Sequence, residues 1–155
     1  MKTIIYRSAT LEDLSTLLEF EQGIITYERP YDSTLKPDPI SYYDLKALIL
    51  SEHSEVHVAQ HNNEIIGSGY AKIIDSKPYN THAQHVYLGF MFVKPEYRGQ
   101  GVILSLTEAL KSWAKKNNIF EARLEVYADN DSAIRAYEKS GFTKNLVEMR
   151  MILND

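Results

Sequence analysis

The chain has 155 residues, of which 44% are hydrophobic and 25% charged, and its formal net charge at pH 7 is −4. These values are ordinary for one globular domain, expected to span residues 1–155. The absence of cysteine excludes disulfides, thiolate zinc ligands and a catalytic thiol, and the negative charge argues against nucleic acid as the main partner. The sequence has no apolar run near the roughly 18 residues of a membrane span and no signal-peptide pattern. We therefore expect a cytoplasmic protein without a membrane partner.

The first half of the chain predicts a strand, two helices and a β-hairpin. Thr10 and Asp13 are spaced as in the Asp form of a capping box, which opens the first helix. Prolines make the segment from Tyr27 to Asp38 a loop. Two glycines around Ser68 predict a bulge or a close backbone approach inside the hairpin's second strand. The expected elements are a strand at Thr3–Ser8, a helix from Thr10, a helix at Ser41–Leu50, and strands at Val56–Ala59 and Ile65–Ile74.

A strand, a tight turn and a helix form the centre of the sequence. The apolar run from Val86 to Val93 is too continuous for a half-exposed strand and predicts a buried central one. After the basic, glycine-containing turn at residues 98–101, the apolar residues Ile103, Leu106, Leu110 and Trp113 recur on one face of a helix. Such a turn aims free backbone N–H groups and the positive end of a helix dipole at one point, which favours phosphate binding.

The remainder of the chain predicts one more strand, a short helix and a closing hairpin. The strand is expected at Phe120–Val126, and the helix at Ala133–Ser140 ends at Gly141. The closing hairpin is expected from Phe142–Lys144 and Val147–Leu153. The complete order is β-α-α-β-β-β-α-β-α-β-β, which indicates an α/β domain with a mixed sheet.

Two stretches resemble the signatures of the GCN5-related N-acetyltransferases (the GNAT family). Arg98 and Gly101 match the first two fixed positions of the family's acetyl-CoA loop, Gln/Arg-x-x-Gly-x-Gly/Ala, whereas Ile103 stands where the family has Gly or Ala. The second signature is similar to Leu124-Glu125-Val126, Asn130, Ala133-Ile134, Tyr137, Lys139 and Gly141-Phe142. The resemblance implies the GNAT fold, with six to seven mostly antiparallel strands and about four helices. It also implies an enzyme without a metal that moves an acetyl group from acetyl-CoA to a primary amine.

The resemblance also assigns roles to residues. The backbone of Met91, Phe92 and Val93 would pair with the pantetheine of acetyl-CoA. The pyrophosphate would be held by the N–H groups of the loop residues Arg98, Gly99, Gln100, Gly101, Val102 and Ile103. Asn130 would bond pantetheine, and Tyr137 would protonate the departing sulfur, its alternative being a packed helix tyrosine.

The general base is open at this stage. Many relatives carry a carboxylate on the central strand, but the matching positions here are Gly89 and Phe90. Glu125 stands where a glutamate acts as base in the ribosomal-protein N-terminal acetyltransferases that it resembles. Its alternative role is an ion pair with Arg123 on the same strand face. His85 and a water chain are the other candidates.

The acceptor amine would bind between the first two helices and the central strand. Candidate residues that combine negative charge with aromatic faces for a cation are Glu28, Tyr31, Tyr42, Tyr43 and Tyr87, with His85 at the strand's start. The acceptor is a small molecule or a peptide N-terminus, and the protein is a monomer or a homodimer. The alternatives are an acyl-CoA binder or sensor with little turnover, and a nucleotide-binding α/β protein.

Overall fold

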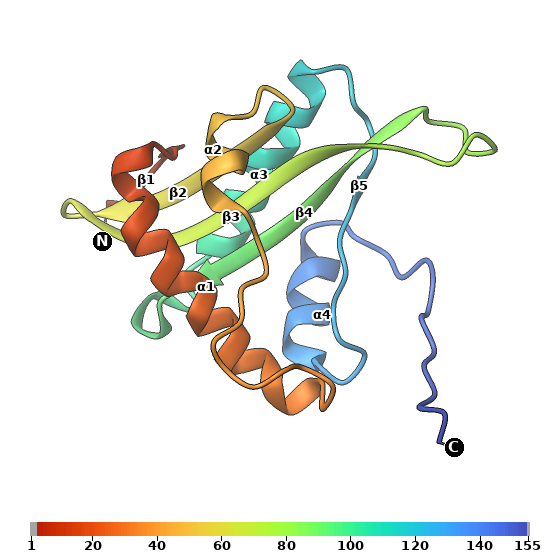
Figure 1. Ribbon diagram of the computed structural model, residues 1–155. Helices are drawn as coiled ribbons and strands as arrows, with labels where there is room; N and C mark the ends of the chain where they lie inside the picture. The colour runs from red at the N-terminus through yellow and green to blue at the C-terminus, as the bar shows by residue number, and fades with distance from the viewer. Residues whose placement is uncertain (1–2, 155) are drawn as a thin grey trace.

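The computed structural model describes residues 3–154, in which one mixed sheet lies between two layers of helices (Figure 1). The sheet has five strands in the order β1-β2-β3-β4-β5, antiparallel except for the β4–β5 pair. Its strands are β1 Ile5–Ser8, β2 Ser54–His61, β3 Glu64–Asp75, β4 Gln84–Val93 and β5 Ala122–Arg123. The helices are α1 Leu14–Glu28, α2 Leu45–Leu50, α3 Val102–Lys116 and α4 Asp131–Lys139. Short 3-10 turns lie at Leu11–Asp13, Arg29–Tyr31 and Pro95–Tyr97.

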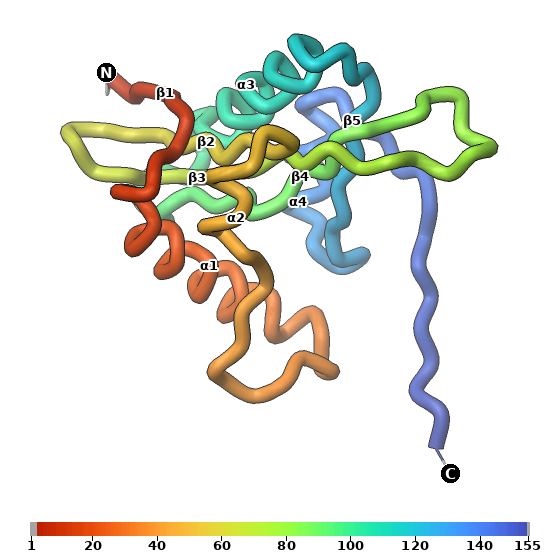
Figure 2. The backbone as a smooth tube through the Cα atoms, turned by 45° about the horizontal axis from the view of Figure 1, so that its top comes forward, coloured from red at the N-terminus to blue at the C-terminus, as the bar shows by residue number. Residues whose placement is uncertain are grey.

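Two apolar layers hold the sheet. On one face, α1 and α2 bury Leu17, Phe20, Ile24 and Leu45 against the sheet residues Val56, Val58, Tyr70 and Phe90. On the other face, Val102, Leu106 and Leu110 of α3 pack on Ile66, Ala71 and Leu88. Figure 2 shows α1 and α3 on opposite sides of the strands. Because helices cover both faces of the sheet, the run of β4 is apolar throughout. Because α3 packs on one of these faces, its apolar residues recur on one side of the helix.

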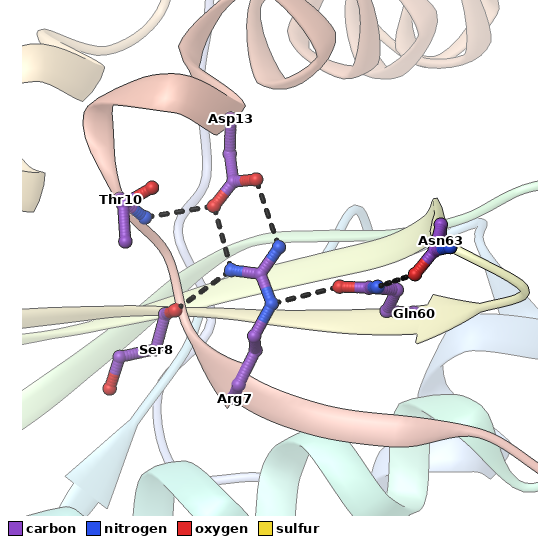
Figure 3. A network of polar contacts seen from close by, with 6 residues as sticks. All are labelled: Arg7, Ser8, Thr10, Asp13, Gln60 and Asn63. Atoms are coloured by element: carbon purple, nitrogen blue, oxygen red, sulfur yellow. Dashed lines mark hydrogen bonds and ion pairs between the residues drawn. The ribbon is translucent and has the colours of Figure 1, made fainter.

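A polar network fixes the start of the fold (Figure 3). The guanidinium of Arg7 donates to both oxygens of the Asp13 carboxylate, at 2.8 and 3.0 Å, and its Nε donates to Gln60 at 2.9 Å. The same carboxylate accepts the N–H of Thr10 at 2.8 Å, as the capping box predicts. Strand β1, the turn that opens α1, and β2 are thereby joined through one buried carboxylate.

The carboxyl-terminal part differs from the sequence prediction. The expected strand Phe120–Val126 pairs only at Ala122 and Arg123, and the expected closing hairpin of Phe142–Lys144 and Val147–Leu153 does not form. Residues 143–154 are all exposed and in no strand, so the sheet has five strands and not six to seven. Alternating apolar residues show that a segment suits a strand, but a strand also needs a partner.

Other boundaries moved by a few residues. Helix α2 begins at Leu45 and not at Ser41, because the Asp44 carboxylate caps it by accepting the N–H of Ala47 at 3.1 Å. Helix α4 begins at Asp131, two residues earlier than expected, since Asn130 is its cap.

Within residues 3–154, no helix combines the length and the apolar character needed to cross a membrane.

Candidate active site

The carboxyl end of β4 carries a bulge. Ser68 of β3 pairs with Phe92 and Tyr70 pairs with Gly89, so Phe90 and Met91 together lie opposite one residue. Phe90 has a φ of +58°, which is rare for a side chain of its size, and it is fully buried. The hydroxyl of Ser68 donates to the Phe90 carbonyl at 3.0 Å and stabilises the irregular backbone. A close backbone approach also occurs at Gly67, where a Cβ would lie 3.1 Å from the carbonyl oxygen of Phe92.

Beside this bulge, β4 and β5 separate. The two strands pair in parallel at only two positions, Val86 with Ala122 and Tyr87 with Arg123. In the described chain no strand pairs with β4 from Leu88 to Val93 on that side. Apart from the carbonyls of Phe90 and Val93, which accept from Ser68 and Arg98, the backbone groups that face this edge are therefore available to an extended ligand.

The loop after β4 leads into the first turn of α3. Gly99 and Gly101 have φ of +75° and +80°, and Gly101 is the residue before the helix begins. A Cβ at either glycine would meet nothing within 4 Å, so the loop faces open space. The side chain of Arg98 turns back, its Nε donating to the Val93 carbonyl at 3.0 Å.

The first turn of α3 presents free donors. The N–H groups of Val102, Ile103 and Leu104 have no i−4 acceptor within the helix, and none of them donates to another described residue. With the helix dipole, they make an anion-binding point of the kind that the sequence predicts. Ile103 itself is half-buried and packs on the apolar cluster below α3.

Helix α4 brings two further predicted residues into the structure. Asn130 is buried, and its side-chain oxygen accepts the N–H of Ala133 at 3.3 Å, which leaves its NH₂ group as a donor. Tyr137, two turns further along, is half-buried with its ring against the edge of Phe142. Burial raises the pKa of Tyr137 to about 12, so its hydroxyl holds its proton at neutral pH.

Glu28 lies at the end of α1 among tyrosines. Burial raises the pKa of Glu28 above its usual value. The nearby hydroxyl of Tyr42 is buried, and its interaction with the Glu28 carboxylate offsets part of this rise in the pKa of Glu28. The carboxylate of Glu28 also acts electrostatically on Tyr87 and Tyr137, which places all three around one region. A cavity of about 300 Å³ adjoins this region and is lined by Tyr42, Tyr43 and Tyr70, among others.

Glu125 faces the same region from beyond β5. Burial raises the pKa of Tyr87, and the nearby Glu125 carboxylate raises it further. Tyr87 is therefore within electrostatic reach of both Glu28 and Glu125. The alternative partner of Glu125 is engaged elsewhere, since the Nε of Arg123 donates to Glu121 at 2.6 Å. The structure thus brings together two carboxylates from distant parts of the chain.

The other candidates lie at the margin of this cluster. His85 is buried at the amino-terminal end of β4, six residues before Met91, with its Nδ1 2.7 Å from the Ser76 hydroxyl. Burial lowers the pKa of His85. Tyr31 stacks on Tyr127 with ring centroids 5.9 Å apart, near the mouth of the tyrosine region.

Three residues of this region were not anticipated from the sequence. Tyr70 and Tyr127 complete the aromatic surface, and the hydroxyl of Tyr127 donates to Asp32 at 3.1 Å. Glu21 is fully buried in α1 and accepts the N–H groups of Tyr42 and Tyr43, both at 2.8 Å. A glutamate on the apolar face of a helix predicts a buried polar contact. The sequence does not indicate which residues that glutamate contacts.

The family is decided by comparison with known sequences. The sequence model of the acetyltransferase (GNAT) family matches residues 21–142. The chain belongs to this family. The matched range includes the bulged end of β4, the loop before α3, and both Asn130 and Tyr137 of α4.

Individual relatives agree with this family. The chain is 29% identical over 117 residues to N-alpha-acetyltransferase 30 of Schizosaccharomyces pombe, which covers 76% of each protein. A predicted acetyltransferase from Clostridium acetobutylicum, solved with acetyl-CoA, superimposes with a TM-score of 0.76 at 22% identity, covering 96% of both chains. An aminoglycoside 6'-N-acetyltransferase from Acinetobacter baumannii gives 0.73 at 20% identity, covering 98% of this chain and all of that one. At these identities, the two structures show a shared fold. The GNAT fold expected from the sequence is confirmed.

Proposed function

We propose that this protein is an acetyl-CoA-dependent N-acetyltransferase that acts on a primary amine. The observation that carries the proposal is the edge of β4 from Leu88 to Val93, which is free of strand pairing and ends beside the free amides of α3. An extended thioester arm suits this edge, and an anionic pyrophosphate suits those amides. Membership of an acetyltransferase family supports the same assignment.

Three parts of the chain would bind different parts of acetyl-CoA. The backbone of Met91, Phe92 and Val93 would bond the pantetheine and orient the thioester carbonyl. The loop and first turn of α3, from Arg98 through Gly99, Gln100, Gly101 and Val102 to Ile103, would bind the pyrophosphate. Asn130 would donate its free amide to the pantetheine. Ile103 packs toward the core, so its side chain need not crowd a phosphate at its own N–H.

The acceptor amine would enter on the tyrosine side. It is protonated at pH 7, because an alkylamine has a pKa of about 10.4. Glu28 and Glu125 both supply negative charge near Tyr87, whose ring can also attract a cation. The buried Tyr42 hydroxyl beside Glu28 offers a hydrogen-bond acceptor, and Tyr31 lines the approach. This chemistry fits a small cationic molecule or the N-terminus of a peptide.

Proton transfer completes the proposed reaction. Glu125 removes one proton from the protonated acceptor amine, and the neutral nitrogen then forms a bond to the acetyl carbon while the carbon–sulfur bond breaks. Tyr137 donates its proton to the departing thiolate and regains one from the second proton that the nitrogen loses as it becomes an amide; its high pKa keeps its proton available at neutral pH. His85 or a water chain is the alternative base, and the place of His85 at the far end of β4 favours Glu125 over it.

Binding and turnover test this function. Acetyl-CoA should raise the thermal unfolding temperature, and a panel of primary amines and peptides should reveal acetyl transfer. Glu125→Gln and Tyr137→Phe should each lower kcat by roughly 10²-fold with little change in acetyl-CoA affinity. Tyr79→Phe is a matched control, since Tyr79 is 82% exposed in the connection between β3 and β4.

The alternative function gives a different result. An acyl-CoA binder or sensor would bind acetyl-CoA yet acetylate no amine of the panel, and neither variant would change a rate. This alternative is considered because neither Gly89 nor Phe90 on β4 has an ionisable side chain. Stabilisation by ATP or NAD but not by acetyl-CoA would overturn the assignment of the loop itself.

A further inference from the structure

A row of three side chains crosses the acceptor face of the sheet, the face that α1 and α2 cover. Lys72 of β3 is the register partner of Tyr87 of β4, and Tyr87 is in turn the register partner of Arg123 of β5. Directly opposed residues on neighbouring strands point to the same face of a sheet. For this row it is the acceptor face, because Tyr87 packs against the apolar cluster below α1 and α2. A lysine and an arginine therefore lie on either side of Tyr87.

Arg123 keeps part of its guanidinium free. Its Nε donates to Glu121 at 2.6 Å and its Nη2 donates to Asn80 at 3.4 Å, whereas its Nη1 donates to no described residue. Nη1 and the second hydrogen of Nη2 form a fork that can bind a carboxylate through two parallel hydrogen bonds. Burial lowers the pKa of His85, and the charge of Arg123 lowers it further, so this guanidinium acts on the acceptor face.

Lys72 is a second cation of the row. It is exposed, and in the described chain its Nζ makes no ion pair or hydrogen bond. It lines the cavity of about 300 Å³, whose one acidic lining residue, Asp44, already caps α2 through the N–H of Ala47. Neighbouring strands are about 4.8 Å apart, so the Cα atoms of Lys72 and Arg123 are separated by about 10 Å. Two long side chains at this separation can reach one anion between them.

The acceptor face thus carries charges of both signs. Glu28 and Glu125 act electrostatically on Tyr87, the same residue that the two cations flank. Arg123 and Glu125 are two residues apart, which is about 7 Å along an extended chain. The chain as a whole has a net charge of −4, so this cationic row is a local feature. Its charges are complementary to a molecule that carries both an ammonium and a carboxylate.

We propose that the acceptor is an aminocarboxylate, with its amine at Glu125 and its carboxylate bound by Arg123 and Lys72 beside Tyr87. The proposal rests on the proposed acetyl transfer and narrows its substrate. A suitable molecule has its amine and its carboxylate roughly 7 Å apart, as in an extended 6-aminohexanoate, in which six bonds separate the nitrogen from the carboxyl carbon. An acceptor that carries only amines would bring a second cation to this row and is disfavoured.

Three acceptors of matched length test the charge preference. The compounds 6-aminohexanoate, 6-aminohexanamide and 1,6-diaminohexane share a terminal primary amine and differ in the charge at the other end. We expect kcat/KM for the carboxylate to exceed that for the amide by about tenfold, which corresponds to one charge-assisted hydrogen-bonded pair, and the diamine to be the poorest of the three. A ratio of carboxylate to amide below about threefold, or a diamine that is the best acceptor, would overturn the proposal.

Charge-removing variants assign the preference to the row. Lys72→Gln and Arg123→Gln should each lower the ratio of carboxylate to amide by about threefold or more through the KM of the carboxylate, and leave kcat/KM for the amide within twofold. Arg123→Lys should retain more of the ratio than Arg123→Gln. Lys72 is exposed, so its variant should fold whatever the effect at Arg123. Lys115→Gln is the matched control, because Lys115 is exposed on α3, which covers the other face. An equal fall in the ratio for Lys115→Gln would contradict the assignment.

A peptide pair identifies the source of the carboxylate. Amidated tripeptides with Glu or Gln at the second position carry the same N-terminal amine and differ by one carboxylate. A Glu peptide that exceeds 6-aminohexanoate assigns the carboxylate to an acidic peptide, and the reverse order assigns it to a small amino acid. Equal acetylation of charged and uncharged acceptors would overturn the role of the row and leave acetyl transfer standing. Acetylation of no acceptor at all, despite binding of acetyl-CoA, would overturn both.

Discussion

Glu21 should hold the tyrosine segment in place, and its replacement should affect both stability and acceptor binding. Its buried carboxylate accepts two backbone N–H groups, from Tyr42 and Tyr43, at 2.8 Å each. Glu21→Ala leaves both N–H groups without a partner, at a cost of about 1–3 kcal/mol each. Removing a buried charge offsets part of this cost. We therefore expect Glu21→Ala to lower the free energy of unfolding by about 3 kcal/mol. Glu21→Gln should lower it by about 1 kcal/mol, because its amide oxygen still accepts hydrogen bonds.

Guanidinium unfolding at pH 7 measures the free energy of unfolding of both variants. A loss of about 3 kcal/mol should lower the melting temperature of Glu21→Ala by about 6–12 °C in a chain of this length. Glu19→Ala is the control on the same helix, because Glu19 is exposed and its change should stay within about 0.5 kcal/mol. The freed segment should raise the acceptor KM of Glu21→Ala and leave acetyl-CoA affinity unchanged. A loss below about 1 kcal/mol, or an equal rise in KM for Glu19→Ala, would refute this reasoning.

Four other changes separate cofactor, stability and acceptor effects. Gly101→Val should abolish acetyl-CoA binding, measured by calorimetry, at a stability cost of only about 1–2 kcal/mol, since its φ of +80° is strained but no atom lies near the new side chain. Ile103→Gly should cost roughly 2–4 kcal/mol in urea unfolding and leave acetyl-CoA affinity within twofold, because the side chain packs on the core. Arg7 holds the pKa of Asp13 below its usual value, so this pair stabilises the fold above about pH 4 and its contribution is lost as the pH falls through the lowered folded pKa. Asp13→Asn should therefore cost about 2 kcal/mol at pH 7, and the gap from the unmodified chain should shrink in unfolding curves at low pH. Because burial raises the pKa of Glu28, the acceptor KM should rise as the pH falls through that raised value, and Glu28→Gln should show the higher KM at every pH.

The centre of the fold could be predicted because its signals are local. The apolar run of β4, the glycines at 99 and 101, and the apolar stripe of α3 each specify their own structure within about ten residues. The two GNAT signatures supplied the family on the same short-range basis. The Gly67 to Gly69 run correctly indicated an irregularity, although the residue that takes the unusual φ, Phe90, lies on the neighbouring strand.

The acceptor region and the carboxyl-terminal segment, residues 143–154, depend on contacts between distant residues. Nothing near Tyr70 or Tyr127 in the sequence indicates that they join Tyr42 and Tyr43, because that meeting follows from how α1, β3 and the segment after β5 pack. The closing hairpin was predicted from alternating residues that the structure leaves unpaired. A strand pattern states which face is apolar, and only the assembled chain decides what covers it.

The packing around Gly89 bears on the position of the catalytic base. A Cβ at Gly89 would lie 2.7 Å from the hydroxyl of Tyr70, so the ring of Tyr70 occupies the space that a carboxylate on β4 would need. Phe90 next to it turns its side chain into the core, where it packs edge-on against Tyr43. Neither position of β4 can therefore present an acid to the acceptor without rebuilding the aromatic layer. The segment after β5 is the neighbouring element that carries a carboxylate to Tyr87, and that carboxylate is Glu125. The packing of Tyr70 and Phe90 is thus the physical reason why we propose Glu125, and not a residue of β4, for proton removal.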